Sequence, residues 1–138
     1  MYILCKKFNE KSISGFINLS VDTECEVIDN IIHYNNKPIC YITSQNAYDY
    51  FSNNEDGKGK QRFKLIGKIK DELKRLNNEY SDKVAGLLKD CETEEEVQSA
   101  LANIEPIETN ITLNYEFYNK PINELQSIYD KIKEEKYE

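Results

Sequence analysis

The chain of 138 residues has no tryptophan, one methionine and one histidine, and its four cysteines are scattered. Zinc sites need Cys or His ligands at short spacings, and His33 with Cys5, Cys25, Cys40 and Cys91 offers no such pair. We therefore expect no metal and no cofactor. Cys5 and Cys40 lie in apolar runs, which predicts buried, reduced thiols rather than structural disulfides.

Long hydrophobic runs are also missing. No stretch approaches the ~20 apolar residues that a membrane span needs, and residues 1–7 become charged too early for a secretory signal. The composition, 31% charged and 39% apolar, is that of a globular protein. We expect one domain over residues 1–138, located in the cytosol.

A catalytic pattern is missing too. The 25 acidic residues show no pairing that indicates acid–base chemistry, and no nucleophile has a base at a known spacing. His33 follows apolar residues in a strand-like run, which favours packing over a role as general base. The sequence therefore indicates binding more than catalysis.

The net charge of −7 is spread unevenly. Residues 58–75 carry eight Lys or Arg against two acids, whereas residues 90–138 carry four Lys against thirteen acids. Such a field repels duplex nucleic acid everywhere except at the basic stretch. The acidic last third is either a solvated face or a mimic of nucleic-acid phosphates that is presented to a basic partner.

The first third of the chain reads as short strands. Runs of β-formers over residues 1–8 and 13–19 flank Asn9-Glu10-Lys11-Ser12, which predicts a hairpin turn. Residues 26–34 and 39–42 predict two more strands around a turn at Asn35-Asn36-Lys37-Pro38, because Asn tolerates positive φ. We expect four antiparallel strands over residues 1–43.

Helical patterns dominate residues 44–104. Ser44 is a good N-cap for a helix over residues 45–51. From about residue 60, apolar residues recur every three or four positions as far as Leu87, which predicts a long amphipathic helix. Thr93 and Glu96 form a capping box for a helix that ends before Pro106.

The last part adds a strand and a helix. Alternating apolar residues over 107–117 predict a fifth strand, and residues 121–135 predict a final amphipathic helix. The expected fold class is α+β. It has a small antiparallel sheet of about five strands, with the long helix and two or three further helices packed on one face.

One loop stands out as a candidate ligand site. Glycines just before a helix N-terminus, with cations nearby, favour an anion such as a phosphate. The candidate phosphate-binding residues are Gly57, Lys58, Gly59, Lys60, Arg62 and Lys64, and the aromatic residues that could stack a base are Tyr48, Tyr50, Phe51 and Phe63. The alternative is a flexible loop that leads into a solvated basic face. Likewise, the stripe over residues 66–87 is either the domain's own core or the seam of a homo-oligomer.

Two segments resemble an uncharacterised family of small proteins from phages and prophages of low-GC Gram-positive bacteria. The first segment, residues 44–65, contains the matching motifs Ser44-Gln45, Ala47-Tyr48-x-Tyr50-Phe51, Asp56-Gly57-x-Gly59 and Arg62-x-Lys64-Leu65. The second segment, residues 117–125, matches as Phe117-Tyr118-Asn119-x-Pro121-Ile122-x-x-Leu125. The chain departs from that family at Leu113-Asn114-Tyr115-Glu116, where the family is Trp-rich. The resemblance implies a phage context and a host-cell cytosol, and names no activity.

The leading hypothesis is a non-catalytic, phage-type counter-defence protein that binds and sequesters a phosphorylated nucleotide signal through residues 56–60, called the glycine loop below. The second is an acidic protein inhibitor of a host defence effector, in the manner of anti-CRISPR proteins. A nucleotide hydrolase and a structural or regulatory phage protein are further alternatives. In each case the partner is a nucleotide-type molecule or a host protein, without membrane or duplex nucleic acid.

Overall fold

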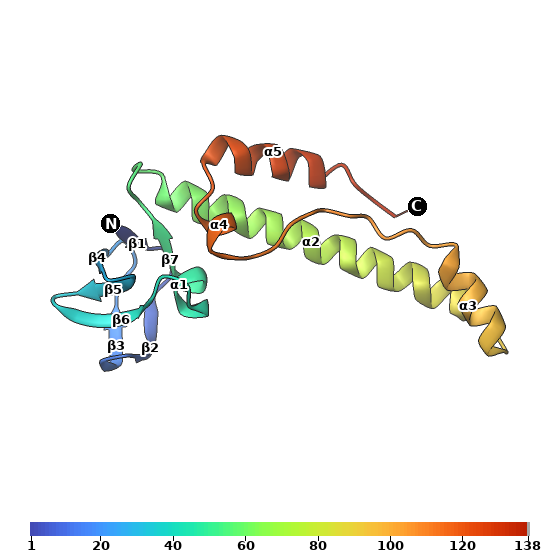
Figure 1. Ribbon diagram of the computed structural model, residues 1–138, viewed down its shortest axis with the longest axis horizontal. Coiled ribbons are helices and arrows are strands. Elements are labelled where there is room, and N and C mark those ends of the chain that lie inside the picture. The colour runs from blue at the N-terminus through green and yellow to red at the C-terminus, as the bar shows by residue number, and fades with distance from the viewer. Residues whose placement is uncertain (138) are drawn as a thin grey trace. The chain divides into compact units, whose positions relative to one another are not determined.

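The computed structural model describes residues 1–137 and has the predicted α+β class, with a five-stranded antiparallel sheet, a long helix and several further helices. The strands are β1 (Tyr2–Leu4), β2 (Phe8–Ser12), β3 (Gly15–Leu19), β4 (Glu24–Ile28), β5 (Ile31–Tyr34), β6 (Lys37–Tyr41) and β7 (Phe51–Asn53). The helices are α1 (Gln45–Tyr50), α2 (Gly59–Leu88), α3 (Glu94–Ala102), α4 (Tyr115–Tyr118) and α5 (Ile122–Ile132). Figure 1 labels them along the chain.

The chain forms two compact units. Unit 1 comprises Met1–Gly67 and Ile111–Gln126, and unit 2 comprises Lys68–Asn110 and Ser127–Glu138. α2 therefore begins in unit 1 and ends in unit 2. The expectation of a single domain stays a prediction.

Unit 1 contains both sheets. The larger has the strand order β6-β5-β4-β1-β7, and β2 and β3 form a separate two-stranded sheet. The core of unit 1 consists of residues from the strands and α1 together with Ile42, and Leu4, Phe8, Ile32 and Ile39 are fully buried. Ser44 caps α1 as predicted, because its side chain accepts the N–H of Ala47. These strands and α1 can be followed in Figure 1.

Two turns differ from those predicted in the first third. Asn9–Lys11 lie within β2 rather than in a turn, because Phe8 and Ser12 at its ends are both buried. The turn instead uses Gly15, at φ +95, and Ser12, whose Oγ accepts the N–H of Ser14. The run 26–34 is also two strands, since Asp29 and Asn30 adopt positive φ and reverse the chain.

The predicted turn at Asn35-Asn36 is confirmed, with φ values of 48° and 64°. Pro38 follows inside β6, the terminal strand of the sheet, next to an irregularity in the pairing with β5. Proline is accepted there because an edge strand does not need every N–H for the ladder.

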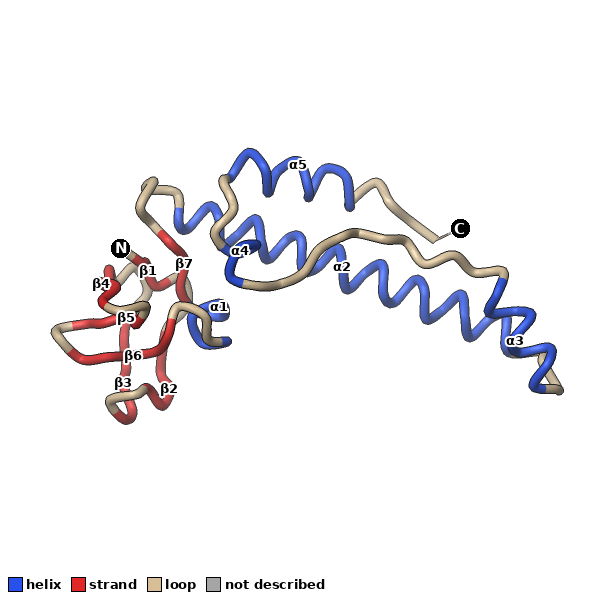
Figure 2. Tube along the Cα trace, in the orientation of Figure 1, coloured by secondary structure: helices blue, strands red, loops and turns tan. Residues whose placement is uncertain are grey.

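The fifth strand predicted over residues 107–117 is wrong. Residues 104–113 have no helix or strand, and Tyr115–Tyr118 form α4, which Asn114 caps by accepting the N–H of Phe117. Figure 2 shows residues 104–113 as a loop. The strand order of the sheet contains no segment beyond β7, so the alternating residues have no ladder to join.

The remaining helices lie close to their predicted bounds. α2 continues through Asn77-Asn78 without a break, and Thr93 caps α3 by accepting the N–H of Glu96. The Glu96 carboxylate accepts the N–H of Glu92 rather than that of Thr93, so the capping box is only half formed. Within residues 1–137, no helix combines the length and apolar character needed to cross a bilayer.

Candidate functional site

Three backbone N–H groups of the glycine loop are hydrogen-bonded within the loop and to the residue Asn54 just before it. Gly59 donates its N–H to Asn54 Oδ1 at 2.8 Å, Lys58 donates to Asp56 Oδ1 at 3.0 Å, and Gly57 donates to the Asn54 carbonyl at 3.1 Å. An anion site at a helix N-terminus depends on amides that are free to face the ligand. Here the side chains of Asn54 and Asp56 and the Asn54 carbonyl already accept these three amides.

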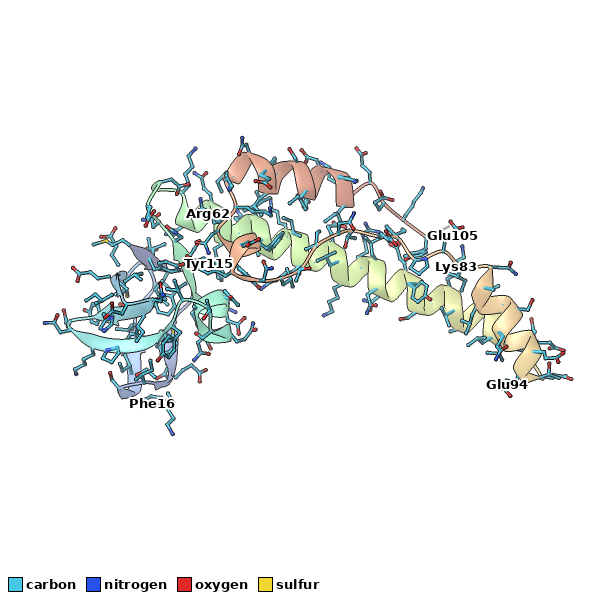
Figure 3. All side chains as sticks on the ribbon, in the orientation of Figure 1. Phe16, Arg62, Lys83, Glu94, Glu105 and Tyr115 are labelled. Carbon is cyan, nitrogen blue, oxygen red and sulfur yellow. The ribbon has the colours of Figure 1, made fainter. Side chains whose placement is uncertain are left out.

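Arg62 is only 4% exposed, and its guanidinium group forms hydrogen bonds within the protein. Nη2 donates to Asp56 Oδ2 at 2.5 Å, Nη1 to the Asn53 carbonyl at 2.6 Å, and Nε to the Lys120 carbonyl at 3.0 Å. The hydrogen bond from Arg62 lowers the pKa of Asp56. This arrangement gives Arg62 a structural role in place of the predicted grip on a phosphate, and Figure 3 labels its position in unit 1.

The three lysines among the predicted phosphate ligands behave differently from Arg62. All three are exposed, and Lys60 forms an ion pair of 2.5 Å with Asp22, which raises the pKa of Lys60. Lys58 and Lys64 make no ion pair with any residue from 1 to 137. Of the predicted phosphate ligands, these two are the cations that remain available.

Three of the four predicted stacking residues have ring partners within unit 1. Tyr48 lies flat against Tyr118, with centroids 4.3 Å apart and planes 5° apart. Tyr50 meets Phe8 edge-on at 5.0 Å, and Phe51 is buried in the core. Phe63 is half-buried at the start of α2. The predicted base-stacking platform is therefore largely engaged in packing.

The titratable groups give little support to catalysis. Burial raises the pKa of the Cys5 and Cys25 thiols to about 11, which leaves little of the thiolate that a nucleophile requires. His33 Nδ1 lies 2.9 Å from the Ile31 carbonyl, and this nitrogen carries the proton because a carbonyl oxygen can only accept. Among residues 1–137, no three His, Cys, Asp or Glu residues gather as a metal site would require.

A polar clamp in unit 2 was not foreseen from the sequence. Arg75 donates to Glu72 and Glu79 and to the carbonyls of Ile132 and Glu135. Glu79 also accepts the N–H of Tyr137 at 3.1 Å, and these hydrogen bonds lower its pKa. The Tyr137 hydroxyl then accepts the N–H of Ile107 at 2.6 Å. The clamp ties the end of α5 and the following residues to α2.

Next to this clamp is an open hollow of about 520 Å³. Its lining is polar and of mixed charge, with Lys83, Ala102, Asn103, Glu105, Ile107, Lys136 and Tyr137. Lys83 and Lys136 have interaction partners of their own. A hollow with carboxylate and ammonium groups side by side does not select one kind of ligand.

The acidic arm, defined here as residues 90–108, is the most highly charged exposed feature of unit 2. It carries seven carboxylates, no Lys or Arg lies between residues 90 and 119, and every one of the seven is exposed. They are Asp90, Glu92, Glu94, Glu95, Glu96, Glu105 and Glu108. None of them forms an ion pair within residues 1–137. Figure 3 labels Glu94 and Glu105 on this arm.

Comparisons of the chain with known families, proteins and structures found no match. No protein-family model, no curated protein and no solved structure matches this chain. The resemblance to phage and prophage proteins stays a prediction, and the function has to be argued from the arrangement of the residues.

Proposed function

We propose that this chain is a non-catalytic binding protein that uses its acidic arm to occupy a basic site on a partner protein. In a phage context, which the family resemblance implies, that partner is a host defence effector. A basic site built for nucleic-acid phosphates would accept a row of carboxylates as a substitute.

The observation that supports this proposal is the unpaired state of the acidic arm. Its seven exposed carboxylates form no ion pair with any residue from 1 to 137, and of the seven only Glu105 lines the hollow with Lys83 and Lys136. They can therefore face Lys and Arg of another molecule. Exposed charges of one sign also speed the encounter with an oppositely charged partner. The internally bonded glycine loop is our reason for ranking nucleotide capture second.

Charge-matched variants test this proposal. Glu94→Lys with Glu105→Lys alters the acidic arm, whereas Glu24→Lys with Glu26→Lys makes the same charge change on β4, where both glutamates are also exposed. Affinity capture from host extract, followed by mass spectrometry, should recover a stoichiometric basic protein with the native chain and the β4 variant. The arm variant should lose it, and added salt should weaken the capture. Equal capture by both variants, or no capture at all, would rule the proposal out.

Nucleotide capture remains the second candidate because Lys58 and Lys64 are exposed and without an ion pair among the described residues. A thermal-shift scan with cyclic and linear nucleotides tests it, since ligand at about 100 times its Kd stabilises the native state by roughly 2.7 kcal/mol. Lys58→Glu with Lys64→Glu is the appropriate variant, because a change at the buried Arg62 would disturb the fold itself. A shift that survives this variant would place any nucleotide elsewhere.

A further inference from the structure

The stretch from Asn77 to Asn103, called the helical tip below, contains no buried residue. It comprises residues 77–88 of α2, the connection 89–93, α3 and Asn103, and it lies between the buried residues Leu76 and Ile104. Ordering each residue costs backbone entropy, and burial of apolar surface normally offsets that cost. Within residues 1–137 the helical tip has only part of this compensation: Tyr80, Val84, Leu88, Val97 and Ala100 are half-buried, and Tyr80 meets the ring of Tyr137 at 5.4 Å.

Both helices of the tip nevertheless carry apolar stripes. On α2 the stripe consists of Val84, Leu87 and Leu88, and on α3 of Val97, Ala100 and Leu101, at the spacing of three and four that places residues on one helix face. Leu87 is 41% exposed and Leu101 is 39% exposed. A helix of nine residues such as α3 is marginal in water without a packing partner. The stripes thus present an apolar face that is incompletely covered.

The charges around this face favour one kind of partner over another. The helical tip contains seven acidic residues and only two lysines, Lys83 and Lys89. A second copy of the chain would bring two strongly acidic tips together, and like charges across an interface are unfavourable. An amphipathic helix with Leu-type residues on one face and Lys or Arg beside them complements both the stripes and the acids.

We infer that the helical tip is the docking surface for a basic amphipathic helix of a partner protein. This inference rests on the proposed function, because it specifies how the partner of the acidic arm is recognised. The apolar stripes receive the apolar face of the partner helix, and the carboxylates flank its Lys and Arg residues.

Fluorescence anisotropy with two labelled synthetic peptides tests this inference. One peptide places Leu at helical spacing among Lys residues, and the other has the same composition in an order without helical period. The native chain should bind the amphipathic peptide at least about tenfold more tightly, because burial of Leu side chains adds to the charge attraction. Leu87→Ser with Leu101→Ser should remove most of that preference.

A matched control uses Phe16→Ser, since Phe16 on β3 of unit 1 is 72% exposed and outside the helical tip. This variant should bind like the native chain, and an equal loss at Phe16 would overturn the inference by showing non-specific apolar binding. Circular dichroism of each variant should show unchanged helix content.

The remaining outcomes separate the two proposals. Equal binding of both peptides overturns helix docking while leaving the acidic-arm function standing. Binding of neither peptide at low salt counts against both. A dimer mass in light scattering that Leu87→Ser with Leu101→Ser abolishes would show that a second copy covers the tip, and it would overturn the inference.

Discussion

Arg62 joins three segments of unit 1 through one guanidinium group. It reaches the end of β7 through the Asn53 carbonyl, the glycine loop through Asp56, and the start of α5 through the Lys120 carbonyl. Arginine suits this position because its planar fork offers several donors in fixed directions. The same geometry explains why the loop holds its shape although Asp56 and Gly57 are exposed.

Arg62→Ala should therefore destabilise the protein by about 2–3 kcal/mol, because it leaves the part-buried carbonyl groups of Asn53 and Lys120 without the charged donor that they face. Urea unfolding followed by circular dichroism measures this free energy. Lys64→Ala, an exposed change two residues away, serves as the control and should stay within about 0.5 kcal/mol of the native chain. Similar stabilities of the two variants would show that Arg62 is not structural.

The ion pair also predicts a pH dependence at Asp56. Its pKa is lowered in the folded state, chiefly by the hydrogen bond from Arg62, so folding favours the carboxylate. The resulting stability is fully present above the unfolded pKa of about 3.9 and is lost as the pH falls through the lower folded pKa. The stability difference between the native chain and Asp56→Asn should be constant from pH 7 to 5 and shrink below pH 4. A difference that is the same at pH 3 and pH 7 would contradict this account.

The sequence shows where the basic residues lie along the chain, but it does not show which of them are buried. Arg62, Lys60 and Lys64 look alike in a pattern of charge. In the structure Arg62 is buried and hydrogen-bonded, Lys60 is exposed and paired with Asp22, and Lys64 is exposed. The distinction depends on Lys120, which lies 58 residues further along the chain. Asp56, six residues before Arg62, was the nearby residue in the sequence that indicated an ion-pair partner for Arg62.

At the scale of whole elements, periodicity predicted the helices well and the segment 107–117 poorly. A helix satisfies its hydrogen bonds within itself, so the pattern of α2 and the caps at Ser44 and Thr93 are sufficient signals. A strand needs a neighbour, and no local pattern shows whether one exists. Asn114, an N-cap of α4, was the available sign that the strand would not continue.

The surroundings of two glycines in α2 predict opposite effects of alanine substitution on stability. A Cβ on Gly59 would lie 2.8 Å from Ile3 Cγ2 and 2.9 Å from the Asn53 carbonyl oxygen, whereas a Cβ on Gly86 would meet nothing within 4 Å. Gly59→Ala should cost about 1–3 kcal/mol through overpacking. Gly86→Ala should stabilise by roughly 0.5–1 kcal/mol, because alanine is the better helix former.

Thermal unfolding of both variants beside the native chain checks this pair. Opposite shifts of the Tm support the close approach at the start of α2. If Gly59→Ala raised the Tm as much as Gly86→Ala, the contact between Gly59 and β1 would not exist in solution.

For the molecule as a whole, the distribution of burial separates a conventional core from a region without one. Unit 1 has a continuous hydrophobic cluster that includes residues from β1 to β7. Residues 77–103 of unit 2 have no buried side chain, although their sequence carries helical stripes as regular as those before Leu76. Sequence periodicity reports that a helix has an apolar face, and it does not report whether the chain itself covers that face.

This contrast predicts a gradient of hydrogen exchange along the single helix α2. Amides around Ile69, whose side chain is fully buried, should exchange at least about tenfold more slowly than those around Leu87. The reason is that residues 77–103 can open locally without exposing any core, whereas opening around Ile69 exposes buried apolar surface. Exchange measured by mass spectrometry at peptide resolution, with β1 and β6 as the reference for global unfolding, gives both rates. Equal protection at Ile69 and Leu87 would mean that α2 opens as one unit, and the helical tip would then owe its stability to the core of the same chain rather than to a partner.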